Sequence, residues 1–344
     1  MRILVVGAVC GGTVPMGKSI CNAFIAIGQQ ASLLDFSTFL PQFLELGLSP
    51  DPARIQVFMD SVRKRLLDEI IGCQPEMILG MAQSPLNNPG LLAAFRRAGI
   101  KLCYWFVEDG QLFPYWKNIA ASFDHFFTIQ KEPFLTELKL VGCRNPYYLP
   151  AAFDDLAAPN PSTKEPAIAV SFVGAPYPNR VRLLERLGPA LQIFGEGWDQ
   201  HQNPSVRIGN RRISESECRE IYGRSLVNIN LHSSIHPEGF GTGDFVNPRT
   251  FEIAGLGAFQ LTDTRQLLPL HFDQACEIPA FGQWEAMRAA IEYFSTHEAD
   301  RMAFAVNARK RVLQEHTYRH RAREILNLVR KRPRVVNNGT PGRT

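Results

Sequence analysis

The sequence predicts an α/β protein made of two doubly wound domains, each a parallel sheet covered by helices. Short apolar runs alternate with segments of helical periodicity, which is typical of strands buried on both faces. The alternation stops once, in a segment rich in proline, serine and asparagine, and then restarts. The chain of 344 residues is also about twice the usual length of one domain.

The first half begins with a strand and continues as a βαβα succession. Arg2–Gly7 is apolar on both faces, and a glycine loop separates it from the first helix. Gly28 and Gly99 follow helical segments, where glycine readily adopts the left-handed conformation that ends a helix. The expected strands are Arg2–Gly7, Ala31–Asp35, Met77–Gly80, Lys101–Val107 and His125–Thr128, and the expected helices are Gly17–Ile27, Asp51–Ile71, Leu91–Arg97 and Tyr115–Ala121.

The second half repeats the plan after a linker. We expect a first domain at 1–153, a linker at 154–166, a second domain at 167–330 and a basic, disordered tail at 331–344. The strands expected in the second half are Ala167–Val173, Leu191–Phe194, Leu226–Leu231, Ala258–Thr262 and Cys276–Ile278, and its helices are Asn179–Leu187, Trp284–Ser295 and Glu298–Arg330. Two such domains place a site in the crevice between the carboxyl ends of their strands.

Composition excludes several classes of protein. Apolar residues make up 45% and charged residues 20%, and Lys+Arg exceeds Asp+Glu by only 37 − 33 = 4. This small excess argues against a nucleic-acid partner, and no apolar stretch is long enough to span a membrane. Residues 1–6 lack the basic start and cleavage site of a secretory signal. The seven cysteines are scattered without a Cys-x-x-Cys pair, so we expect a cytoplasmic protein without a zinc site or disulfides.

The first glycine loop matches the pattern of a phosphate loop. Gly12 to Ser19 fits G-x-x-x-x-G-K-[ST], follows a strand and opens a helix. Pro15 removes one of the backbone N–H groups that such a loop turns toward phosphate. The alternatives are a nucleotide hydrolase, a glycine turn that allows tight helix packing, and a loop that faces the cleft between the domains; we favour the last.

The segment from Glu238 to Gly257 carries the strongest site signal. Asn247 is a good N-cap and Pro248 suits the first position of a helix. Arg249 would then lie at the positive end of the helix dipole, which is favourable when an anion is bound there too. We therefore predict a diphosphate site at Asn247, Arg249 and Thr250, with Glu252 close enough to reach a ribose hydroxyl. The alternative is an exposed Arg249–Glu252 ion pair.

Glycines at other strand ends extend this predicted donor site. Gly174 and Arg180 follow the first strand of the second domain, where phosphates dock in such sheets. The alternative for Arg180 is a surface arginine without a ligand. Gly197 lies beside Trp198, which would either wall a base pocket or belong to the core. Gly12 of the first domain is the remaining residue of the predicted donor site.

The second half resembles the group-1-type domain of the CgeB-type, spore maturation protein-like glycosyltransferases. The resemblance rests on Ser171-Phe-Val-Gly174 with Arg180, Phe194-Gly-Glu-Gly-Trp198, Asn247-Pro-Arg-Thr-Phe-Glu252-Ile-Ala-Gly-Leu-Gly257, Leu261-Thr-Asp263 and Glu315-His-Thr-Tyr318 with Arg321. It covers about half of the chain, from about Ile168 to Leu326. The first half matches more loosely, at Gly11-Gly12, Gly28 and Trp105-Phe-Val-Glu-Asp109.

The resemblance implies the GT-B fold, with two Rossmann-like domains facing across a cleft and C-terminal helices packing back. It implies transfer of a sugar from a nucleotide-diphosphate donor, such as a UDP-sugar, to an acceptor nucleophile without a metal or other cofactor. Glu252 would hold the donor ribose and the loop from Glu238 would cover the donor sugar. Related retaining enzymes have two glutamates with seven residues between them, whereas thirteen separate Glu238 from Glu252. The role of Glu238 and the stereochemistry stay open.

Candidate bases lie in the first domain. Glu108 and Asp109 end a strand, so at least one should face the cleft and could take the proton of an acceptor hydroxyl. A strand-end turn with two solvated acids is the alternative. His232 and His236 lack a third ligand, so no metal site is expected. The competing functions are a phosphate-loop hydrolase and a sugar-nucleotide-binding protein without catalysis.

Overall fold

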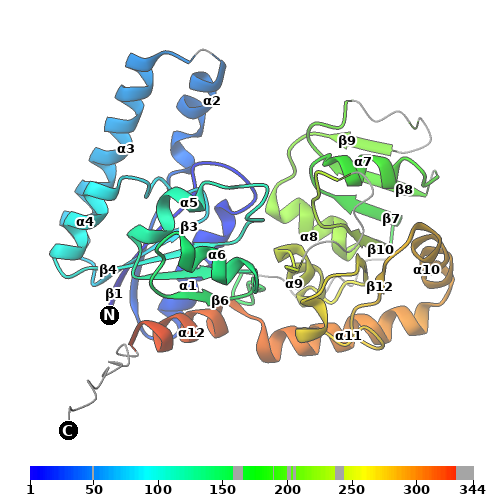
Figure 1. Cartoon of the computed structure of the whole chain (residues 1–344). Coiled ribbons are helices and arrows are strands. Elements are labelled where there is room, and N and C mark those ends of the chain that lie inside the picture. The colour runs from blue at the N-terminus through cyan, green and yellow to red at the C-terminus, as the bar shows by residue number, and fades with distance from the viewer. Residues whose placement is uncertain are drawn as a thin grey trace, which may run out of the picture.

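The structure, a computed structural model, describes residues 1–48, 50–157, 166–188, 190–199, 203, 207–236 and 244–330. Two lobes lie side by side, and each contains one six-stranded sheet (Figure 1). All neighbouring strands are parallel, and helices flank both sheets. The predicted class of fold is confirmed.

The N-terminal lobe has the strand order β2-β1-β3-β4-β5-β6. Its central strands are buried on both faces because helices cover them, and Tyr104 and Trp105 of β4 are completely buried. The strands are β1 (Arg2–Val6), β2 (Gln30–Leu34), β3 (Met77–Met81), β4 (Lys101–Phe106), β5 (His125–Thr128) and β6 (Pro146–Tyr148). The helices are α1 (Val14–Ala26), α2 (Leu40–Leu48), α3 (Pro52–Cys73), α4 (Pro89–Arg97), α5 (Trp116–Ile119) and α6 (Phe134–Leu140), with short 3₁₀ turns at Ser37–Phe39 and Ala120–Ser122.

The C-terminal lobe has the order β9-β8-β7-β10-β11-β12. The direction of the chain connections reverses between β7 and β10, which makes this pair the switch point at which such sheets bind ligands. The strands are β7 (Ile168–Val173), β8 (Leu191–Gly195), β9 (Arg207–Asn210), β10 (Ser225–Asn230), β11 (Gln260–Asp263) and β12 (Ala280–Phe281). The helices are α7 (Pro178–Leu184), α8 (Glu215–Gly223), α9 (Pro248–Gly255), α10 (Trp284–Thr296) and α11 (Glu298–Glu315), with a 3₁₀ turn at Leu268–Leu270.

The chain returns to the first lobe through α12 (Tyr318–Arg330), which packs against α1 (Figure 1). The prediction of one helix over Glu298–Arg330 was therefore wrong. The helix breaks at His316 and Thr317, where the backbone pairs with Phe153. The Phe153 N–H donates to the His316 carbonyl at 2.9 Å, and the Tyr318 N–H donates to the Phe153 carbonyl at 3.1 Å. Gly255 lies against the Phe153 ring, where a Cβ would be only 2.3 Å from the nearest ring atom.

Another predicted element also differs. The strand expected at Cys276–Ile278 is wrong, because Asp273 folds that segment into a turn by accepting the N–H groups of Ala275 and Glu277; the last strand lies at Ala280–Phe281. Among the described helices, none combines the length and the apolar character that a bilayer span requires. The domain boundaries stay a prediction, since residues 158–165 lie outside the described part of the chain.

Candidate functional site

The first turn of α9 lies at the switch point of the second sheet. Asn247 caps the helix, because its Oδ1 accepts the Thr250 N–H at 3.0 Å, and Pro248 occupies the first helical position. The Asn247 Nδ2 donates to Asn230 Oδ1, at the end of β10, at 2.9 Å. The predicted start of this helix is therefore correct, and β10 fixes its position.

A buried histidine supports the same turn from behind. The His232 Nε2 accepts the Asn247 N–H at 2.9 Å, so its Nδ1 carries the proton and donates to Asp263 Oδ1 at 2.7 Å. Burial lowers the pKa of His232 to about 4. Burial alone would raise the pKa of Asp263, but His232 and Arg265 hold it well below its usual range. His232 is thus a neutral positioning residue.

We expect acid to weaken this arrangement. Between pH 6.5, near the pKa of an unfolded histidine, and about 4, the unfolded chain binds a proton that folded His232 does not, so stability falls as the pH falls. One unit of pKa corresponds to about 1.4 kcal/mol, which gives His232 a contribution of about 2 kcal/mol between pH 7 and pH 5. Urea unfolding at both pH values should show this loss in the wild type and a smaller loss in His232→Asn. An equal loss in both proteins would contradict the assignment.

Two arginines meet beside Gly174, at the end of β7. A Cβ on Gly174 would lie 3.2 Å from Arg249 Nη2 and 3.3 Å from Arg180 Nη1, so both guanidinium groups approach the same point. Both also lie over the Phe172 ring. Within the described residues Arg249 donates to Asn230 at 3.4 Å and forms no ion pair with Glu252, so the simple Arg249–Glu252 pair is not present. Two like charges held together favour an anion between or beside them.

Arg180 lies beside Gly174, at the predicted strand end, but its donors are used by the backbone. It is buried, and it donates to the carbonyls of Leu231, at 2.9 and 3.2 Å, and of Ala175, at 3.1 Å. Burial and the neighbouring Arg249 lower its pKa to about 9. Its donors therefore hold the backbone of the switch point, and its charge acts on the site from behind Arg249.

Thr250, Gly197 and Trp198 likewise have structural contacts. The buried Thr250 hydroxyl donates to Asn247 Oδ1 and accepts from Asn230 Nδ2. Gly197 adopts a φ of 88°, which glycine tolerates best. Trp198 is only 2% exposed and donates its ring N–H to the Gly174 carbonyl at 2.8 Å, so it belongs to the core instead of walling a base pocket.

One cavity of about 200 Å³ lies between the lobes at Glu252. Its lining comes from Gly11 and Gly12 of the first lobe and from Glu252, Arg212 and Arg219 of the second. Burial raises the pKa of Glu252. Gly12 and Glu252 are thus brought to one place, as the predicted donor site requires.

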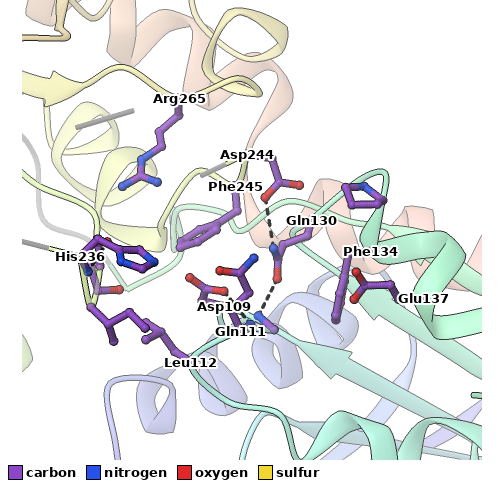
Figure 2. A pocket seen from close by; sticks show the side chains of 15 residues that line it. Asp109, Gln111, Leu112, Gln130, Phe134, Glu137, His236, Asp244, Phe245 and Arg265 are labelled. Carbon is purple, nitrogen blue, oxygen red and sulfur yellow. Dashed lines mark hydrogen bonds between the residues drawn. The ribbon is translucent and has the colours of Figure 1, made fainter. Parts of the chain in front are cut away.

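A second cavity of about 170 Å³ lies between the lobes at Asp109 (Figure 2). Asp109 enters it from the first lobe, and His236, Phe245 and Arg265 enter it from the second. Burial raises the pKa of Asp109, and nearby Asp244 raises it further while Arg265 lowers it. One of the two predicted acids therefore faces the cleft.

Glu108 points elsewhere. It is 8% exposed, and its carboxylate accepts from the Tyr115 hydroxyl at 2.5 Å and from Gln83 Nε2. Burial raises its pKa. Glu108 does not line either cavity described above, so this placement gives no support to a catalytic role.

Comparison with known proteins finds a family to which the second lobe is similar. Residues 179–327 match the family described as glycosyl transferase-like. This match covers 149 of the 344 residues, most of them in the second lobe. Much of the chain is similar to the spore protein CgeB of Bacillus subtilis, at 24% identity over 273 residues, or 74% of this chain and 83% of that protein. The resemblance inferred from the sequence is confirmed.

Solved structures share the architecture of both lobes. Sucrose-phosphate synthase from Thermosynechococcus elongatus aligns with a TM-score of 0.62 at 10% identity, covering 96% of this chain and 98% of that one. Anabaena HepE in complex with UDP-glucose aligns with a TM-score of 0.57 at 12% identity, covering 95% and 98%. The predicted GT-B fold is therefore confirmed.

Asp244 is a site residue that the sequence reasoning missed. Seven residues separate it from Glu252, the same spacing as between the two glutamates of related retaining enzymes, although the first acid here is an aspartate. Its Oδ1 accepts from Gln130 Nε2 at 3.1 Å and its Oδ2 accepts the Lys131 N–H at 3.0 Å, so it joins the two lobes (Figure 2). A search for any acidic residue at this spacing before Glu252, and not only for a glutamate, would have found Asp244. Glu238 lies outside the described residues.

The Gly12–Ser19 segment does not form a phosphate loop. Helix α1 begins at Val14, so the residues that would wrap around phosphate form its first turn. Lys18 is exposed on this helix, and the Ser19 hydroxyl donates to the Pro15 carbonyl at 3.2 Å. The hydrolase alternative is therefore not favoured. Within the described residues no three His, Cys, Asp or Glu side chains form a potential metal site.

Proposed function

We propose that this protein is a glycosyltransferase that moves a sugar from a nucleotide-diphosphate donor to an acceptor nucleophile in the cleft between its lobes. The observation that carries the proposal is the pair of guanidinium groups beside Gly174, without a carboxylate partner among the described residues, at the first turn of α9. Arg249 and the positive end of the helix would bind the diphosphate there.

The two cavities suggest how the donor is oriented in the cleft. We place its ribose at Glu252, whose carboxylate can accept hydrogen bonds from hydroxyl groups, with the Gly11–Gly12 loop facing the same cavity. The sugar would then extend to the cavity at Asp109 and Asp244. Anabaena HepE has the same fold and was solved with UDP-glucose, which supports a UDP-sugar as the donor class here.

The reaction breaks the bond between the anomeric carbon and the donor phosphate and forms a bond from that carbon to the acceptor oxygen. The nucleoside diphosphate leaves with the bonding electrons, and Arg249 would stabilise its negative charge. With inversion, Asp109 is our candidate to take the acceptor proton. With retention, the departing phosphate takes it and Asp109 orients the acceptor. Activity without a metal and a cytoplasmic location stay predictions.

The test is release of free nucleoside diphosphate from a panel of nucleotide sugars, with and without candidate acceptors. We expect one donor to be consumed, and Lys18→Ala to keep this activity because Lys18 is exposed and lines neither of the two cavities. Magnesium-dependent hydrolysis of nucleoside triphosphate that disappears in Lys18→Ala would contradict the proposal. Donor binding without release, with every acceptor, would instead identify a binding protein without catalysis.

A further inference from the structure

The cavity at Asp109 is lined by a buried cation, Arg265, two of whose donor nitrogens have no hydrogen-bond partner among the described residues. Arg265 follows β11 and is 2% exposed. Its Nη2 lies 2.8 Å from Asp263 Oδ2, yet neither Nε nor Nη2 makes a well-aligned hydrogen bond to any residue that the structure describes. A buried donor left unsatisfied is costly, so such a group calls for a partner.

The arginine is held in a fixed direction toward the cavity. Its guanidinium lies 5.6 Å from the centre of the Phe245 ring, and both side chains line the cavity (Figure 2). Asp263, which pairs with it, is itself fixed by His232. Arg265 is therefore pre-organised, which lowers the entropic cost of binding a ligand oxygen.

The charges around the cavity decide which ligand fits. Asp109 and Asp244 face it with negative charge, and the charge of Arg265 is already balanced by Asp263. A carboxylate on the ligand would meet two acids of like charge. An uncharged ring with several hydroxyl groups can instead donate to Asp109 and accept from Arg265. The volume of about 170 Å³ is below the range of drug-sized sites, which suits a single sugar unit.

We infer that Arg265 binds the transferred sugar and that this cavity selects a neutral monosaccharide over an acidic one. This inference rests on the proposed function and adds to it a specificity-determining residue and a class of sugar. Arg265 donates to a hydroxyl oxygen of the sugar, while the nucleotide is bound elsewhere, at Arg249 and Glu252.

Calorimetric titration with UDP, UDP-glucose and UDP-glucuronate tests the inference. If a nucleotide screen selects another base, its diphosphate and the matching sugar derivatives replace these probes. The wild type should bind the glucuronate donor at least about tenfold more weakly than the glucose donor. Equal affinity for the two donors would overturn the inference and needs no variant.

Arg265→Lys supplies the second arm, since lysine keeps the charge near Asp263 but loses the planar fork. We expect the dissociation constant for UDP to stay within about twofold and that for UDP-glucose to rise about tenfold. An unchanged ratio of the two constants, or an equal rise in both with a lower Tm, would show a merely structural role. A wild type that binds no nucleotide would refute the proposed function itself, whereas an unchanged ratio with normal UDP binding refutes only the role of Arg265.

Discussion

Replacing Arg249 with alanine should remove most of the stabilisation that a nucleoside diphosphate gives the protein. At a ligand concentration 100-fold above the dissociation constant, the wild type should gain about 2.7 kcal/mol. Hydrogen bonds to a charged group contribute about 1.5–3 kcal/mol, so the variant should keep less than about 1.4 kcal/mol of this gain. The measurement is the change in unfolding free energy, or in Tm, with and without ligand.

The unliganded Arg249→Ala protein gives an internal control. The Arg249 side chain makes a long hydrogen bond to Asn230 and lies over the Phe172 ring, whereas its removal relieves repulsion with Arg180, so we expect little change in stability. Arg288→Ala is the matched variant, because Arg288 pairs with Glu292 on the exposed face of α10. It should keep the full gain from ligand. The same gain in both variants would refute the diphosphate site.

Replacing Asp109 with asparagine should lower turnover by about 10²–10⁴-fold if Asp109 takes the acceptor proton. Nucleotide affinity should stay near that of the wild type, since Asp109 lies in the cavity away from Glu252. In the wild type the base must be ionised, and burial raises its pKa. We therefore expect activity to fall toward acid with a midpoint above about 3.9, the usual value for aspartate.

Stability separates this functional role from a structural one. A raised pKa means that the folded state binds a proton more tightly than the unfolded state, so the group favours folding at low pH and loses this effect as the pH rises through its folded pKa. Asp109→Asn should therefore be at least as stable as the wild type at pH 7 while its activity is low. A less stable variant with normal turnover would contradict the role. Glu108→Gln, the adjacent change, should spare turnover.

Much of the fold was predictable because local signals agree with the tertiary structure. Strands apolar on both faces and glycines after helices located most elements of the two sheets. The errors lie where long-range pairing decides the backbone. Phe153 interrupts the last helix at His316 and Thr317, and no local pattern in that helix predicts pairing with a residue so distant in the sequence.

The site was only partly predictable, because exposure and direction depend on packing. The cap at Asn247 and the position of Arg249 followed from helix chemistry. Glu108 and Asp109 are adjacent acids, and only the structure shows that one turns inward to Tyr115 while the other faces the cleft. Arg265 carried no motif at all; its significance comes from burial beside Asp263.

A crystal structure with bound UDP tests the central claim most directly. We expect the diphosphate within hydrogen-bonding distance of the Arg249 guanidinium at the start of α9, with the ribose beside Glu252. A nucleotide seated on the Gly12–Ser19 segment with its phosphates away from Arg249, or found on the outer surface of either lobe, would contradict the account.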